Sequence, residues 1–184
     1  MTRSTIEIVT TPDDHRIAKL AALAIGLHLL EAVVPSPLPG VKPGIANIVT
    51  LYVLYRYDFA TAAWVSLLRV VASSLLLGNF LSPTFALSLA GAVLSLLLLR
   101  FALHLPRRWF GPVSLSVLAA FAHIGGQMLV VWLWLIPHAG VAYLLPIFAG
   151  VALFFGSING LIAARLLRDN GASENRLPHP EDHS

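Results

Sequence analysis

The side chains of this chain that could do chemistry are a few charged and polar residues set among long apolar runs. Arg69 lies inside one of these runs, and Lys42 lies in the segment between the first two of them. An arginine in the middle of a membrane costs at least about 2.5–3.5 kcal/mol on insertion scales, so it normally faces a partner or a wet cavity. Two such cations would suit an anionic or a polar, partly anionic ligand.

Glu31 is the only carboxylate in the apolar part of the chain, and it precedes Lys42 closely enough to pair with it or with Arg69. One interpretation is a structural ion pair between Glu31 and Arg69 that fixes the register of two helices. The other is that these side chains contact a ligand, as charged groups within membranes commonly do. We favour ligand contact.

His123 and Gln127 form a second polar pair. They are four residues apart and therefore share one face of a helix, and Gly125 and Gly126 between them leave room for a neighbour or a ligand. A lone histidine is more often a satisfied core residue, but the pairing makes a role in ligand binding an equal alternative. A zinc site that combines His123 with His28 and a carboxylate lacks any spacing that would specify it.

Other chemistry lacks its usual motifs. The chain has no cysteine, no GxxxxGK[ST] phosphate loop and no DDxxD pair, since Asp13 and Asp14 stand alone near the N-terminus. Magnesium-dependent diphosphate chemistry needs several converging carboxylates, and ATP hydrolysis by P-loop chemistry needs the missing motif. We therefore expect no intrinsic catalysis, no metal and no cofactor.

The segment from Pro35 to Gly44 holds four prolines and two glycines in ten residues. Such a composition forbids a continuous helix. The apolar run that follows, Gly44 to Tyr55, is too short to cross a bilayer as one straight helix. Short or interrupted apolar segments mark substrate sites in transporters, because the start of a half-helix can point its N–H groups into a cavity. Lys42 would lie at the mouth of that half-helix.

The elements that must position these residues are membrane helices. Hydrophobic residues make up 57% of the 184 residues and charged residues only 11%, and the mean hydropathy is +0.79. These values are outside the range of soluble domains. Apolar runs with the length of spanning helices, separated by breakers, predict an all-α, polytopic, compact six-helix transmembrane bundle with a broken helix or loop between the first two helices. The expected spans are about 17–34, 44–56, 59–78, 82–103, 113–136 and 143–166.

The bundle is expected to occupy residues 17–168, between a cytoplasmic N-terminal segment, 1–16, and a disordered cytoplasmic tail, 169–184. Acidic residues near the N-terminus and the lack of a small-residue cleavage site argue against a removable signal peptide. The net charge of +3 calls for no nucleic-acid partner.

The distribution of basic residues predicts the orientation. On the six-span arrangement, ten of the twelve lysines and arginines fall on one side, which identifies that side as the cytoplasm. They are Arg3, Arg16, Lys19, Arg56, Arg100, Arg107, Arg108, Arg165, Arg168 and Arg176. The protein is therefore expected in a bacterial-type cytoplasmic membrane with both termini inside, and the two exceptions, Lys42 and Arg69, are candidates for function.

Two small-residue patterns predict helix-packing faces: Ala18-x-x-x-Ala22 in the first helix and Gly156-x-x-x-Gly160 in the sixth. Small residues four apart allow close helix approach, so internal packing is the default explanation. The first pattern could instead face another subunit.

Several motifs together resemble one known family. They are Pro39-Gly40-Val41-Lys42-Pro43-Gly44-Ile45-Ala46-Asn47-Ile48, Leu68-Arg69, Gly78-Asn79-Phe80-Leu81-Ser82-Pro83, Ser88-Leu89-Ala90-Gly91 and Ala122-His123-Ile124-Gly125-Gly126-Gln127. The chain resembles the Gx transporter family, also labelled heptaprenyl diphosphate synthase component I, which is similar to the substrate-binding S components of energy-coupling-factor vitamin transporters. The resemblance covers about residues 17–168.

The transporter label implies a six-helix protein that binds a small vitamin-like or cofactor-like solute on its external side, with Lys42, Asn47 and Arg69 as ligand contacts. It also implies a coupling transmembrane subunit with ATPases as partners, and Ala18 and Ala22 match the surface that meets such a coupler. The synthase label implies a noncatalytic membrane partner of a soluble polyprenyl diphosphate synthase. A scaffold subunit without a ligand is a third alternative. We favour solute uptake, because a broken helix and buried charges are what a solute site needs.

Overall fold

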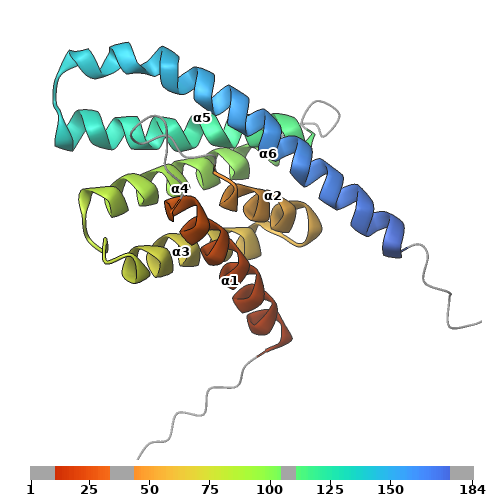
Figure 1. Cartoon of the computed structure of the whole chain (residues 1–184). Helices are drawn as coiled ribbons and strands as arrows, with labels where there is room; N and C mark the ends of the chain where they lie inside the picture. Colours follow the sequence, from red (N-terminus) through yellow and green to blue (C-terminus); the bar gives the residue numbers. More distant parts are fainter. Residues whose placement is uncertain (1–10, 34–43, 105–110, 175–184) are drawn as a thin grey trace, which may run out of the picture.

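A computed structural model describes residues 11–33, 44–104 and 111–174, and this part of the chain contains only helices and turns (Figure 1). The α-helices are α1 (Pro12–Val33), α2 (Ala46–Arg56), α3 (Phe59–Leu76), α4 (Pro83–Ala102), α5 (Pro112–Val130) and α6 (Leu145–Glu174). A π-helical turn, η1 (Val131–Leu135), and a 3₁₀ helix, η2 (Ala139–Leu144), connect the last two. The prediction of an all-α protein with six helices is confirmed.

Four segments of the described chain are long and apolar enough to cross a membrane. They are Phe59–Leu76, Pro83–Ala102, Pro112–Leu135 and Ala139–Asp169. Large apolar side chains such as Trp64, Leu97 and Phe154 point outward, which suits a surface that faces lipid rather than water. The chain is therefore a multi-pass membrane protein. The first two helices are not among these four segments. α1 carries charges in its first turns, and α2 has only 11 residues.

Side-chain caps and prolines define where several helices begin. Asp58 accepts hydrogen bonds from the backbone N–H of Thr61 at 2.9 Å and from its hydroxyl at 2.7 Å, and so caps α3. Ser82 caps α4 by accepting from the N–H of Phe85 at 3.3 Å. Pro83 and Pro112 occupy first-turn positions, where a missing N–H costs nothing. These signals place the starts of α3, α4 and α5.

The structure lengthens two helices relative to the predicted spans. α1 begins at Pro12, five residues before the expected start of the bundle, because Thr11 and Asp14 cap it reciprocally: the N–H of Thr11 donates to Asp14 Oδ2 at 2.8 Å and the N–H of Asp14 donates to Thr11 Oγ1 at 3.2 Å. α6 continues to Glu174, so the first six residues of the tail expected to be disordered are helical. No proline interrupts the chain between Pro146 and Glu174, which permits this extension.

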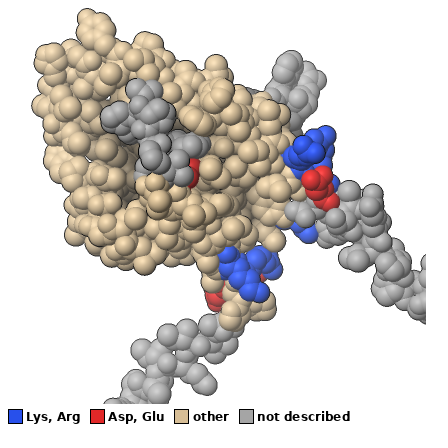
Figure 2. All heavy atoms as spheres, viewed as in Figure 1, with Lys and Arg blue, Asp and Glu red and all other residues tan. Residues whose placement is uncertain are grey.

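Consecutive helices from α3 to α6 pack side by side, and α2 lies against α3 and α6 while α1 covers α2 and α3. The α3–α4 turn and the α5–α6 connection lie at one end of the bundle, which we call the outer end (Figure 1). Lysines and arginines gather at the opposite end, near the start of α1 and the end of α6 (Figure 2). The tightly packed core, with Leu51, Val53, Val65 and Leu99, is built mainly from α1 to α5 with the shorter α2 in its middle.

Glycines allow the helices around α5 to approach closely. A Cβ at Gly160 would lie 2.6 Å from the Cα of Val113, and one at Gly126 would lie 2.5 Å from the carbonyl oxygen of Ala90. Real Cβ atoms do not come so near to backbone, so these contacts require glycine. The packing role predicted for Gly156-x-x-x-Gly160 is confirmed, since both glycines face α5.

Candidate ligand-binding cavity

A cavity of about 400 Å³ lies within the helices, and five of the predicted site residues line it. They are Glu31, Asn47, Arg69, His123 and Gln127. These residues are contributed by α1, α2, α3 and α5, so the fold brings together side chains that are far apart in sequence. Lys42, the sixth predicted residue, lies outside the described residues.

Arg69 is held on the cavity wall with one donor still free. It projects from the middle of α3, its side chain is buried, with 4% of the residue exposed, and its Nη1 donates to Asn47 Oδ1 at 3.0 Å. Its Nε–H has no hydrogen-bond partner among the described residues. A buried donor without a partner costs free energy, and a guanidinium is suited to bind carboxylate or phosphate. The free Nε–H makes Arg69 the strongest candidate contact for an anion.

Glu31 has a structural task at the end of α1. It is as buried as Arg69, and one carboxylate oxygen accepts a hydrogen bond from the backbone N–H of Ile45, immediately before α2. Its other oxygen lies 3.8 Å from Nδ1 of His28. A carboxylate at a helix N-terminus is favourable because it faces the positive end of the helix dipole. Within the described residues no ion pair within 4.0 Å joins Glu31 to Arg69.

The start of α2 is shaped by Gly44 and held by Asn159. Gly44 has a φ of +69°, which favours glycine, and its carbonyl accepts a hydrogen bond from Nδ2 of Asn159 at 3.2 Å. The N–H groups of Asn47 and Ile48 donate to carbonyls one turn back. With Ile45 bound to Glu31, these three N–H groups are all used within the protein. These three groups are therefore not the free donors that were expected at the start of this helix.

His123 and Gln127 do share a helix face and contact each other. Nε2 of His123 lies 3.2 Å from Nε2 of Gln127. The imidazole rests against Gly91 of α4, where a Cβ would come within 2.8 Å of ring atoms. Nδ1 of His123 is buried without a partner among the described residues. Gly91 thus fixes the depth at which the imidazole meets the cavity.

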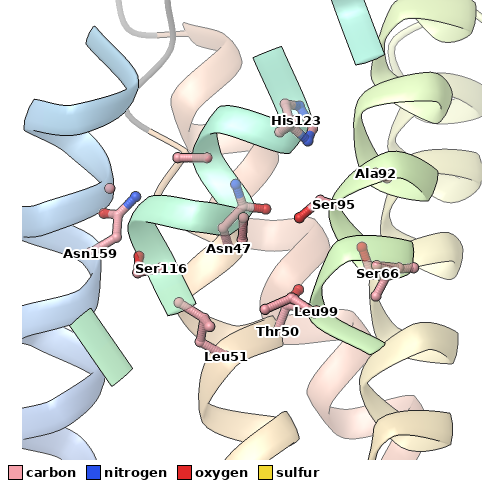
Figure 3. Close-up of a pocket in the computed structure, with 14 residues that line it drawn as sticks. Asn47, Thr50, Leu51, Ser66, Ala92, Ser95, Leu99, Ser116, His123 and Asn159 are labelled. Atoms are coloured by element: carbon pink, nitrogen blue, oxygen red, sulfur yellow. The ribbon is translucent and has the colours of Figure 1, made fainter. Parts of the chain in front are cut away.

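A smaller polar cavity of about 20 Å³ adjoins the main one (Figure 3). Asn47, His123 and Asn159 line both cavities, and hydroxyls from α2, α3, α4 and α5 complete the smaller one. These hydroxyls belong to Thr50, Ser66, Ser95 and Ser116. Thr50 Oγ1 is buried and has no partner among the described residues. These hydroxyls and amides lie among apolar residues such as Leu51 and Leu99, and we call this region of the main cavity its polar floor.

Comparison with known families gives a decisive match. The family model of heptaprenyl diphosphate synthase component I matches residues 20–166, most of the chain. The chain belongs to the heptaprenyl diphosphate synthase component I family. This confirms the resemblance found in the sequence motifs. Neither a curated protein nor a solved structure matches the chain.

The match to the component I family spans every described residue that lines the two cavities. Two groups of these residues carried no functional assignment from the sequence. Asn159 is one of them, although an amide between Gly156 and Gly160 on a packing face is a usable signal. The aromatic residues Phe85, Phe148 and Phe155 also line the main cavity, and nothing in the sequence separates them from phenylalanines that face lipid.

Ala18 and Ala22, which were predicted to meet a partner subunit, are both exposed on α1. They line neither cavity. The described residues contain no group of three side chains that could hold a metal ion. The cavity instead offers a guanidinium, a carboxylate, two imidazoles, amides and hydroxyls, which are groups that bind and orient a molecule.

Proposed function

We propose that this protein is an integral membrane substrate-binding subunit, similar to an S component, for uptake of a small anionic or vitamin-like or cofactor-like solute. The observation that supports this most strongly is Arg69, a buried cation on the wall of a 400 Å³ cavity with a free Nε–H. The volume of the cavity is within the range of small-molecule sites.

The energetics of Arg69 favour a ligand. Burying a guanidinium inside a membrane protein is expensive, and such residues normally mark ligand or ion pathways. Asn47 satisfies only one donor of Arg69, and Glu31 already accepts from Ile45. A carboxylate or phosphate bound in the cavity would satisfy the free Nε–H with a charge-assisted hydrogen bond.

The proposed orientation has six membrane helices and both termini in the cytoplasm of a bacterial-type cell. Basic residues gather at the end of the bundle that contains the start of α1 and the end of α6 (Figure 2), which by the positive-inside rule is the cytoplasmic end. The outer end then faces the exterior. Lys42, which precedes α2, would be a further ligand contact from the external side, alongside Asn47, His123 and Gln127.

Uptake by a subunit of this kind would need partners. The chain has no P-loop, so energy would come from a coupling transmembrane subunit with ATPases. The exposed Ala18 and Ala22 on α1 would form part of the surface for that subunit, because small side chains permit close helix contact.

The family name favours a second candidate function. A component I protein would be a noncatalytic membrane partner of a soluble polyprenyl diphosphate synthase, and a guanidinium suits diphosphate as well as carboxylate. A purely structural subunit would bind no ligand.

Co-purification tests the proposal. The protein is purified in mild detergent from cells grown in rich medium, and bound small molecules are identified by mass spectrometry in the wild type, Arg69→Gln and the control Arg100→Gln, whose side chain lies over the Phe59 ring away from the cavity. A vitamin-like or cofactor-like molecule retained by wild type and Arg100→Gln but lost from Arg69→Gln supports uptake. A polyprenyl diphosphate supports the synthase role, and no ligand in any sample contradicts both.

A further inference from the structure

We infer that the cavity binds an amphipathic ligand, with its polar head beside Arg69 and its apolar body directed toward the outer end of the bundle. This rests on the proposed ligand-binding function and specifies the class of ligand. It follows from the distribution of polar and apolar side chains along the cavity wall.

The polar groups concentrate at the inner part of the cavity. Arg69 and Asn47 are bonded to each other, Asn159 holds Gly44 close by, and His123 contacts Gln127. Asn47, His123 and Asn159 also line the polar floor (Figure 3). A ligand group that reaches this region meets several donors, the Arg69 cation and the Glu31 carboxylate, which accepts from the N–H of Ile45. Arg69 and the neighbouring donors suit a carboxylate or a phosphate.

The wall becomes apolar toward the outer end. Along α5, Met128 and Val131 follow Gln127 and line the cavity, and along α6 the lining includes Phe155, Val151 and Phe148. Leu77 and Phe85, on either side of the α3–α4 turn, lie on the same wall. Polar side chains also occur on this part of the wall: Asn79 and Thr84 lie near the α3–α4 turn, and Ser73, Ser74 and Ser88 lie within about one turn of Leu77 and Phe85.

The two regions are far enough apart to need one elongated ligand. On α6, Phe148 lies eleven residues before Asn159, which corresponds to roughly 16 Å along a helix axis. A compact hydrophilic anion at Arg69 would leave the aromatic wall without apolar contact. A ligand with a ring or chain would bury that surface, at roughly fourfold in affinity per buried methylene.

Two probe series test this inference in purified wild-type protein: inorganic phosphate, phenyl phosphate and 1-naphthyl phosphate, then acetate, benzoate and 1-naphthoate. We expect dissociation constants to fall by about tenfold or more across at least one series. Phe148→Ala should remove most of that gain while changing phosphate or acetate binding little. Phe154→Ala is the matched control, because Phe154 is 62% exposed on the outside of the same helix. Arg69→Gln should weaken every member of the series.

Equal affinity across a series that binds, or equal effects of Phe148→Ala and Phe154→Ala, would overturn the amphipathic assignment and leave the solute-binding function intact. If no probe binds, the co-purified molecule decides: one with a polar head and an apolar body supports the inference, and one without an apolar part overturns it. Absence of both probe binding and any co-purified molecule overturns the proposed function itself.

Discussion

Among single residues, Arg69 and the groups that hold it in place matter most for the proposed binding. Asn47 fixes one end of the guanidinium, while the buried Nε–H has no partner among the described residues, although Arg69 lines the cavity. Glu31, the other charged group on the described wall, is engaged at the start of α2. Glu31 thus already has a partner in the protein, whereas the proposed function gives Arg69 its partner in the ligand.

Arg69→Gln should weaken binding of the co-purified ligand by roughly 10- to 100-fold, because a hydrogen bond to a charged group contributes about 1.5–3 kcal/mol. Glutamine can still donate to Asn47, so the variant should fold. Equilibrium binding in detergent measures the effect, and a monodisperse size-exclusion profile verifies folding. Unchanged affinity in a well-folded variant would exclude Arg69 as a contact.

Gly91→Ala should displace His123, because the added Cβ would come within 2.8 Å of the imidazole. The expected result is weaker ligand binding with little loss of expression. Gly125→Ala is the matched control on α5, where the new Cβ meets only Leu94 at 3.8 Å, an ordinary contact. Equal affinities for the two variants would show that the position of His123 does not matter for binding.

At the scale of helices, caps and glycine contacts determine the frame around the cavity. Asp58→Ala should lower the free energy of unfolding by about 1 kcal/mol, since it removes the side-chain cap of α3. Asp58→Asn should be nearly neutral at pH 7, because asparagine caps equally well. Thermal unfolding in the same detergent compares the two variants, and an equal loss in both would contradict the capping explanation.

The same cap predicts a pH dependence. Hydrogen bonds from the side chain and backbone of Thr61 lower the pKa of Asp58 below its ordinary value of 3.8. Because the pKa is lower in the folded state, this stabilisation is fully present above pH 3.8 and is lost as the pH falls below it. The unfolding temperature of wild type should therefore drop in this range more than that of Asp58→Asn. Parallel pH profiles would show that Asp58 contributes nothing to acid sensitivity.

Gly160→Ala should destabilise the protein by about 1–3 kcal/mol, as overpacking does, because its Cβ would lie 2.6 Å from the backbone of α5. Gly150→Ala in the same helix is the control, since nothing lies within 4 Å of its Cβ. Thermal unfolding of the pair measures the difference. If Gly160→Ala is as stable as Gly150→Ala, the close packing of α5 and α6 is not required.

Much of this helical frame could be predicted from the sequence, because long apolar runs ended by Asp58, Ser82-Pro83 and Gly111-Pro112 have clear boundaries. The early start of α1 was missed since charged residues in its first turn resemble a polar tail, although Thr11 and Asp14 form a recognisable cap. The partner of the Ile45 N–H at the start of α2 could not be predicted, because Glu31 reaches it only through tertiary packing.

For the molecule as a whole, the polar residues of the cavity could be identified from the sequence more easily than the apolar ones. Charged and amide groups are expensive in apolar helices and tend to converge, which made five of the lining residues identifiable. The structure places all five around one cavity: Glu31, Asn47, Arg69, His123 and Gln127. The apolar part of the wall was not identifiable, since Phe148 and the lipid-facing Phe154 look alike in sequence.

The proposed orientation is testable with single-cysteine variants, because the chain contains no native cysteine. Tyr143 lies near the outer end and is 85% exposed, while Arg168 lies at the basic end. Each is replaced by cysteine in a separate variant, Tyr143→Cys and Arg168→Cys. A membrane-impermeant maleimide should label the first in intact cells and the second only after permeabilisation. The reverse pattern would invert the topology and place the outer end in the cytoplasm.

The most direct test of ligand binding is an experimental structure of the protein purified with its co-purified molecule. We predict ligand density in the main cavity with an acceptor atom at hydrogen-bond distance from Nε of Arg69 and with its apolar part against Phe148. A structure in which Nε of Arg69 is paired with a protein group, and the cavity holds only detergent or lipid, would contradict the proposed function.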